Sequence, residues 1–331
     1  MLIIISCSTS QDKKINRLFD SKIENEYFIS SDNTRLHINS WKANNAENII
    51  VAVHGFSDYA TSFKELGKYL KEKNVDLLAF DLRGFGRNEN FGYWFHYNEH
   101  LKDIIEFCKI IKKQNPKKKI FLMGESMGGS LAAKIIVKDK FKFDGLILVA
   151  PSIWDFSKQN FLKSKLVSFL SKIFPNLKVS GKQIIKIKPS NNIEMLKEFS
   201  KDPFVIHQPN LKSLRGVIEL MDDSYLDFKK IINLPTVPTL LIIPVLDEVI
   251  PRKPLINIIK NIDDNAELKN KKITIQVYDK NYHMILRDNN NSTVIQNIHQ
   301  WLNDSDEIYY DISNKNSYEL LIKSKKIHIL D

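Results

Sequence analysis

The chain has 331 residues, of which 43% are apolar and 27% are charged, so it can bury a core large enough for one α/β domain with an inserted or appended piece. Its formal net charge of +10 favours anionic surfaces, but the lysines are scattered and no nucleic-acid motif accompanies them, which argues against nucleic acid as a partner. With two cysteines, Cys7 and Cys108, neither a disulfide framework nor a cysteine metal site is available.

The N-terminal segment, residues 1–25, contains a candidate lipidation site at Cys7. The stretch LIIISC resembles a bacterial lipobox, in which signal cleavage leaves a lipid-modified cysteine at the new N-terminus. Only six residues precede Cys7, and they contain no basic region and no full apolar stretch. Two localisations therefore stay open, membrane association through a lipidated Cys7 and a cytoplasmic protein. No later stretch approaches the roughly 18 to 20 apolar residues that a spanning helix needs.

Eight apolar runs bounded by turn residues predict eight β-strands. In chain order they cover residues 26–30, 35–41, 48–55, 76–84, 119–126, 145–151, 239–245 and 272–279. The first two follow each other as a hairpin, and the others alternate with helical patterns over residues 62–73, 99–113, 128–139, 254–262 and 293–303. This alternation predicts an α/β fold with a mostly parallel, eight-stranded sheet and helices on both faces.

The fifth predicted strand ends in Gly124-Glu125-Ser126-Met127-Gly128, directly before a helical pattern. A nucleophilic serine on a sharp strand-to-helix turn needs small neighbours, because the backbone is strained there and the helix must pack tightly against the strand. The G-x-S-x-G pattern therefore predicts that Ser126 is a nucleophile.

A serine hydroxyl needs a base, and the base needs a carboxylate that orients it. In enzymes with this elbow, the acid and then the histidine come from loops after later strands. Asp247 follows the seventh predicted strand, and its neighbour Glu248 is the alternative acid. His283 is the one of the eight histidines that stands in the loop after the last predicted strand.

Acyl transfer also needs two donors for the oxyanion. The backbone N–H of Met127 opens the helix after Ser126, and the N–H of Phe56 follows Gly55 in the loop after the third predicted strand. His54 is expected to brace that loop rather than to act as a second base.

The motifs HGFSDY, FDLRGFGRNEN, GESMGG, LDEVIP and YHMIL occur in this order between residues 26 and 303. They resemble the monoglyceride lipase and lysophospholipase-like branch of the α/β-hydrolase fold, which is often grouped with serine aminopeptidases. The resemblance implies an α/β-hydrolase fold with Ser126 as nucleophile, Asp247 as acid, His283 as base, and the Phe56 and Met127 amides as oxyanion hole. It also implies structural roles for Asp81, Arg83, Gly84 and Gly86.

A helical region without a central strand interrupts the alternation after the sixth predicted strand. We expect residues 151–235 to form a helical cap, residues 26–150 and 236–303 to form the hydrolase core, and residues 304–331 to form a C-terminal extension. One stretch of the cap has an apolar stripe at helical spacing between basic residues, namely Leu162, Leu166, Phe169, Leu170 and Ile173. This stripe could pack on the core, rest on a membrane, or line an acyl tunnel as part of the substrate site.

The sequence thus predicts a serine hydrolase that cleaves carboxylic esters of monoacylglycerol or lysophospholipid through an acyl-enzyme, with peripheral membrane contact and without cofactor or metal. One alternative is an esterase, thioesterase or peptidase that acts on a small soluble acyl substrate. The other is a catalytically silent hydrolase-fold protein that binds lipid or a partner.

Overall fold

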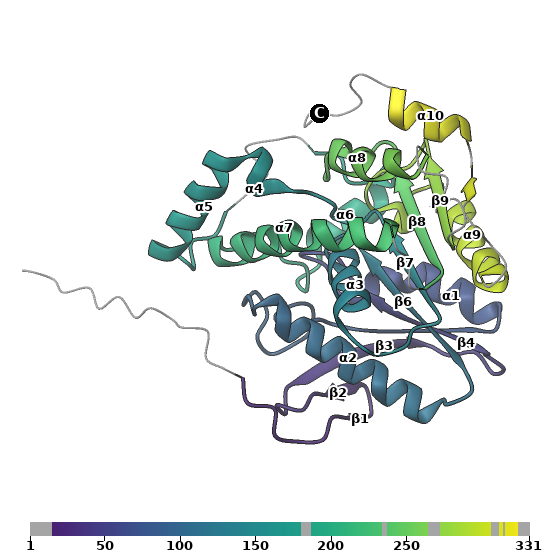
Figure 1. The fold of residues 1–331 in the computed structure, drawn as a ribbon. Helices are drawn as coiled ribbons and strands as arrows, with labels where there is room; N and C mark the ends of the chain where they lie inside the picture. Colours follow the sequence, from purple (N-terminus) through teal and green to yellow (C-terminus); the bar gives the residue numbers. More distant parts are fainter. Residues whose placement is uncertain are drawn as a thin grey trace, which may run out of the picture.

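The computed structural model describes residues 15–179, 187–233, 237–263, 272–305, 311–313 and 315–323, and Cys7 lies outside them. Ten strands of this part of the chain form one sheet in the order β1-β2-β3-β5-β4-β6-β7-β8-β9-β10 (Figure 1). The pairs β1–β2, β2–β3 and β3–β5 are antiparallel, and the other neighbours are parallel. The strands are β1 (Lys22–Glu24), β2 (Tyr27–Ile29), β3 (Arg35–Trp41), β4 (Asn48–Val53), β5 (Val75–Phe80), β6 (Lys119–Glu125), β7 (Gly145–Val149), β8 (Thr239–Pro244), β9 (Ile273–Tyr278) and β10 (Asp311–Ser313).

The predicted mostly parallel sheet with helices on both faces is confirmed, and the eight predicted strands correspond to β2 through β9. The count of eight was too low, because β1 and β10 add a strand of three residues at each edge of the sheet. The predicted helices correspond to α1 (Lys64–Glu72), α2 (Tyr97–Gln114), α3 (Met127–Lys138), α8 (Arg252–Asp263) and α9 (Asn291–Asp304).

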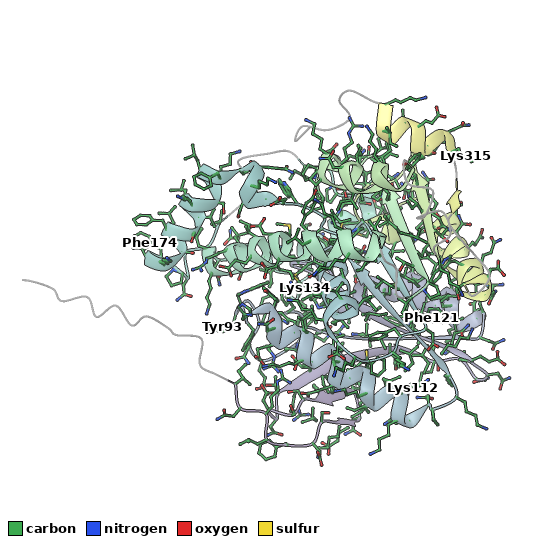
Figure 2. The ribbon with its side chains drawn as sticks, viewed as in Figure 1. Tyr93, Lys112, Phe121, Lys134, Phe174 and Lys315 are labelled. Carbon is green, nitrogen blue, oxygen red and sulfur yellow. The ribbon has the colours of Figure 1, made fainter. Side chains whose placement is uncertain are left out.

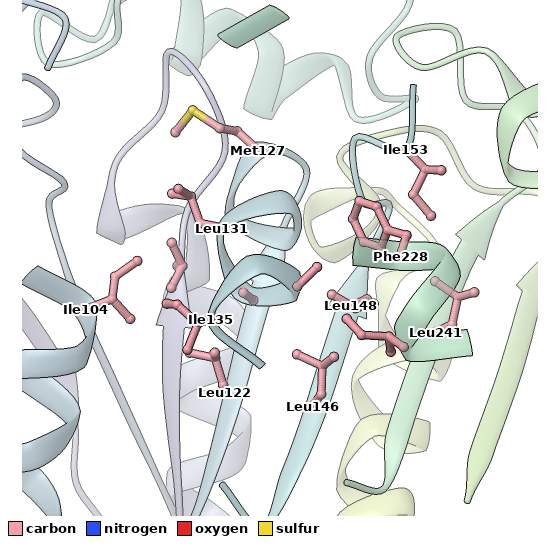
Figure 3. Packing of buried hydrophobic residues seen from close by; sticks show 14 of the residues in the cluster. Ile104, Leu122, Met127, Leu131, Ile135, Leu146, Leu148, Ile153, Phe228 and Leu241 are labelled. Carbon is pink, nitrogen blue, oxygen red and sulfur yellow. The ribbon is translucent and has the colours of Figure 1, made fainter. Parts of the chain in front are cut away.

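Two apolar cores lie on opposite faces of the sheet, because successive side chains of a strand point to opposite sides. Along β6, Ile120 and Leu122 belong to one core, whereas Phe121 and Met123 belong to the other. The first core is covered by α2, α3, α7 and α8, and the second by α1 and α9. Figure 3 shows the first core, where Leu131 of α3 and Phe228 of α7 pack over strand residues such as Leu148.

Between β7 and β8, the described residues form four helices, namely α4 (Phe156–Gln159), α5 (Phe161–Ile173), α6 (Ile193–Lys201) and α7 (Leu211–Asn233). The long helix α7 packs against α3, and its Leu220 and Phe228 are fully buried in the first core. Helix α5 contacts α4 and α7 and projects from the sheet at the left of Figure 1. This segment therefore includes one helix of the core layer and one that lies at its outer edge.

The apolar stripe of α5 does not pack on the core. Leu162 is 80% exposed and Phe169 is 61% exposed. Leu166 and Ile173 are also exposed, and Leu170 is partly buried. Figure 2 shows Phe174, which directly follows the helix, at this outer end of the molecule. Of the three alternatives for this stripe, packing on the core does not fit the structure, because the helix contacts α4 and α7 while most of the stripe is exposed.

The described part of the C-terminal extension completes one edge of the sheet. Strand β10 pairs in parallel with β9, and α10 (Lys315–Lys323) buries Tyr318 and Leu321. Nη1 of Arg252, in the first turn of α8, donates a hydrogen bond of 3.1 Å to the carbonyl of Leu321. The extension thus packs against α8 and β9. Within the described ranges, no helix has the length and apolarity that crossing a bilayer would require.

Candidate active site

The candidate site lies at the carboxyl ends of the parallel strands. The chain runs from β4 to β5 on one side and then returns to place β6 on the other side of β4. Loops that leave neighbouring strands in opposite directions open a crevice at such a switch point. The loop after β4 carries Phe56, the turn after β6 carries Ser126, and the loops after β8 and β9 carry Asp247 and His283.

Ser126 occupies a strained turn. It is the single residue between β6 and α3, and its backbone angles are φ 54° and ψ −116°. Residues with a side chain rarely adopt a positive φ, and such strain is concentrated at functional sites. The flanking glycines are required by space, since a Cβ on Gly124 would lie 2.2 Å from the carbonyl oxygen of Gly128, and one on Gly128 would lie 2.0 Å from that of Val53.

A continuous chain of hydrogen bonds joins the three predicted triad residues. Nε2 of His283 lies 2.9 Å from Oγ of Ser126, and Nδ1 of His283 lies 2.7 Å from Oδ2 of Asp247. Oδ1 of Asp247 accepts hydrogen bonds from the backbone amides of Val249 and Ile250, at 2.8 and 3.0 Å, which hold the carboxylate in place. In this arrangement the imidazole can accept the serine proton while Asp247 orients it.

The surroundings of His283 favour its protonated form. Burial alone would lower the pKa of His283, but the Asp247 carboxylate, and after it the Glu125 carboxyl, raise that pKa above its ordinary value. Only 7% of the His283 surface is exposed. The imidazolium that would form when Ser126 loses its proton is therefore stabilised by two carboxyl groups.

The alternative acid, Glu248, points elsewhere. Its Oε2 accepts a hydrogen bond of 2.7 Å from the backbone N–H of Lys188. The structure thus brings Asp247, rather than Glu248, to His283.

The segments that carry the two expected oxyanion donors lie beside Ser126. A Cβ placed on Gly55 would lie 3.3 Å from Cβ of Ser126, so the loop of Phe56 passes directly over the nucleophile. Met127 is the first residue of α3, where backbone amides point out of the helix. The ring of Phe56 packs edge-on against Phe85 and Trp94, which fixes the loop.

The motif residues around this loop have structural contacts. His54 is fully buried; its Nε2 accepts a hydrogen bond of 2.9 Å from the Leu82 amide, and its Nδ1 lies 2.8 Å from the carbonyl oxygen of Gly55. Oδ1 of Asp81 accepts from the amide of Ala60 at 3.0 Å. These bonds tie the oxyanion loop to the loop after β5, as expected for His54 and Asp81.

Two residues of the site were not singled out from the sequence. Glu125 precedes the nucleophile and is 3% exposed, and Arg287 follows His283 in the same loop and donates to Oδ2 of Asp58. Side chains alternate along β6, so the sequence already places Glu125 on the same face of the sheet as the buried Phe121 and Met123. No such signal exists for Arg287, because its partner Asp58 lies far away in the sequence. Within the described residues, no group of three or more histidine, cysteine, aspartate or glutamate side chains is placed to hold a metal ion.

A family model described as "Serine aminopeptidase, S33" matches residues 44–290 of the chain. The rat (Rattus norvegicus) protein "Monoglyceride lipase" is 24% identical over 187 residues, which cover 55% of this chain and 60% of the rat protein. The match thus spans less than two thirds of that relative's length.

Solved structures resemble the fold over most of the chain. The Paleococcus ferrophilus monoacylglycerol lipase is 23% identical with a TM-score of 0.66, and the match covers 82% of this chain and 99% of that one. A carboxyl esterase from Bacillus coagulans is 18% identical with a TM-score of 0.67, and the match covers 86% and 96% of the two chains. The fold is that of the α/β-hydrolases, and lipases and esterases share it.

Proposed function

The chain belongs to the serine aminopeptidase S33 family, and on this basis we propose that it is a serine hydrolase that cleaves carboxylic esters. The observation that carries the proposal is the unbroken contact from Ser126 through His283 to Asp247. A catalytically silent protein that binds lipid or a partner has no need for a strained serine with a base and an acid in line.

The proposed reaction has two steps. Oγ of Ser126 attacks the ester carbonyl carbon while His283 takes the hydroxyl proton, and the amides of Phe56 and Met127 stabilise the negative charge on the carbonyl oxygen. The C–O bond to the alcohol then breaks, His283 gives its proton to the leaving oxygen, and an acyl-enzyme remains. Water, deprotonated by His283, releases the acid and restores Ser126.

We propose an ester of a long-chain fatty acid as the substrate, and monoacylglycerol before lysophospholipid. The support comes from the relative and the structural neighbour whose names state monoglyceride or monoacylglycerol lipase. The fold itself does not select the acyl length, since a carboxyl esterase resembles it as closely.

We further propose that α5 brings the enzyme to lipid. Its stripe is continued past the helix by Phe174 and Leu177, which are 55% and 54% exposed. Exposed lysines flank it, namely Lys163, Lys165, Lys172 and Lys178. A helix with an apolar face and basic borders is suited to an anionic membrane surface, and a lipidated Cys7 would add a second anchor. Together these features favour activity at a lipid interface.

A panel of esters tests the substrate. We expect the highest kcat/KM on monoacylglycerol of at least eight acyl carbons, lower values on the matching lysophospholipid, and the lowest on acetyl esters, because each buried methylene contributes about 0.8 kcal/mol. Ser126→Ala, measured in parallel, is the control for contaminating lipase. A preference for acetyl esters would reassign the protein to small soluble substrates, and no hydrolysis of any ester would refute the proposed activity.

A further inference from the structure

Glu125, the residue before the nucleophile, is a buried acid with no role in the mechanism so far. On β6 it points to the same side of the sheet as Phe121 and Met123, the side of the second core. The segments that cover this side near the site include Ala60, Phe63, Ile285 and Leu286. Among the described residues, Oε1 of Glu125 has no hydrogen-bond partner. A buried carboxyl oxygen without a hydrogen-bond partner is costly, and it needs a physical explanation.

The segment of Ile285 and Leu286 continues into a cationic residue, Arg287. Arg287 stands four residues after His283, its Nη2 donates to Oδ2 of Asp58, and its guanidinium lies 5.6 Å from the centre of the Phe199 ring. It thereby joins three parts of the site: the oxyanion loop, the histidine loop and helix α6. Its Nε has no partner within the described part of the chain, so one donor is left over.

Charges of both signs surround Glu125. Arg287 and His283 favour its ionised form, and Asp58 and Asp288 oppose it. Burial is the largest influence and raises the pKa of Glu125 to about 7, so the carboxyl is partly ionised at neutral pH. When ionised, Glu125 favours the protonated state of His283. Asp247 has the same effect on His283 and a larger one.

We propose that Glu125 is a positioning residue of the hydrolase, a second buried carboxylate next to the nucleophile that supports the imidazolium form of His283, with the Arg287 guanidinium as its counter-charge. This inference rests on the proposed function. Asp247 orients the imidazole through a hydrogen bond, whereas Glu125 acts through its charge. Its removal should therefore move the pH range of activity, which a merely structural residue would not do.

The experiment measures the second-order rate constant of Ser126 labelling by a fluorophosphonate as a function of pH. Labelling needs neutral His283, so the rate falls on acidification with a midpoint at the apparent pKa of His283. In Glu125→Gln we expect this midpoint to fall by roughly half a pH unit or more, because one negative charge near the imidazole is lost. Glu125→Asp, which keeps the charge, should stay closer to the wild type than Glu125→Gln.

The control is Asp76→Asn, which removes a 5% exposed carboxylate bonded to Lys118 at the opposite end of the strands. It should leave the midpoint unchanged. If Glu125→Gln does not fold, Glu125→Ala removes the same charge and carries the same expectation. A midpoint in the neutral variant that equals or exceeds the wild-type value, or an equal fall in Glu125→Asp or Asp76→Asn, would overturn the inference. Absence of labelling in the wild type would refute the proposed function instead.

Discussion

At the scale of single residues, the contacts of His283 determine where in the pH range Ser126 can be activated. The pKa of His283 lies above its ordinary value, because the opposing effect of burial is outweighed by Asp247 and Glu125. Since only neutral imidazole accepts the serine proton, activity should be full above this raised pKa and should fall as the pH drops through it. The pH profile of kcat/KM on a soluble ester checks this, and we expect its acid midpoint above about 6.5. Activity that persists unchanged to about pH 5 would show that His283 is not the base.

The acid is tested by a pair of neighbouring substitutions. Asp247→Asn should lower kcat roughly 10⁴-fold, because the amide favours the wrong tautomer of the imidazole. Glu248→Gln should stay within about threefold of the wild type, since Glu248 bonds to the Lys188 amide and not to His283. Steady-state kinetics on one ester compares the two variants. A severe effect of Glu248→Gln together with a mild effect of Asp247→Asn would exchange the assignments.

The sequence indicated the residues that short motifs and strand ends bring together. Ser126 is defined by its own neighbours, and Asp247 and His283 each follow a recognisable strand, so their meeting could be expected from topology. The bond between Arg287 and Asp58 joins residues 229 positions apart. Asp58 stands in the HGFSDY motif, but nothing in that motif names Arg287 as its partner. Contacts of this kind depend on the path of two loops, which periodicity does not predict.

At the scale of elements, an ion pair fastens α7 to the helix of the nucleophile. Nζ of Lys134 on α3 is 3.2 Å from Oδ2 of Asp227 on α7, and Lys134 is 1% exposed. Figure 2 shows Lys134 beside α7, which packs against α3. The pair therefore connects the segment between β7 and β8 to the elbow.

A double-mutant cycle measures this pair. Lys134→Met should lower the free energy of unfolding by about 3 kcal/mol, because it leaves Asp227 buried without its main partner. Adding Asp227→Leu should restore much of the loss, since the buried charge at that position is then removed as well. Urea denaturation of the two single variants and the double variant gives the coupling. Strictly additive losses would show that the two side chains do not depend on each other.

Elements with their own apolar pattern could be predicted, and elements defined by a neighbour could not. Strands β4 through β9 are apolar runs that the buried sheet requires. Strand β1, Lys22-Ile23-Glu24, has three residues, and it is a strand because β2 offers a free edge. For α5, the sequence indicated the stripe but not whether another element covers it.

At the scale of the whole molecule, one side carries an exposed apolar face on α5, while the net charge is +10. If this face meets lipid, Leu166→Ser with Phe169→Ser should weaken binding to phosphatidylglycerol vesicles at least about tenfold. Hydrolysis of a soluble acetyl ester should stay within about twofold, because both side chains are exposed. Vesicle sedimentation and a soluble ester assay give the two readouts.

The matched control for this face is Leu320→Ser, an exposed leucine of α10, which is well separated from α5 in Figure 1. It should bind vesicles like the wild type. Equal binding by the double variant and the wild type would show that α5 is not the lipid contact, and equal losses on vesicles and on the soluble ester would indicate damage to the fold.

The central claim is that Ser126 is the nucleophile of a serine hydrolase, and covalent labelling tests it most directly. The protein is treated with a fluorophosphonate, digested and analysed by mass spectrometry, beside Ser126→Ala. We predict one adduct, on Ser126, with loss of ester hydrolysis in proportion to labelling, and neither adduct nor hydrolysis in Ser126→Ala, since loss of the nucleophile should cost roughly 10⁴-fold or more in rate. An unlabelled Ser126 in an active protein, or full hydrolysis by Ser126→Ala, would contradict the account.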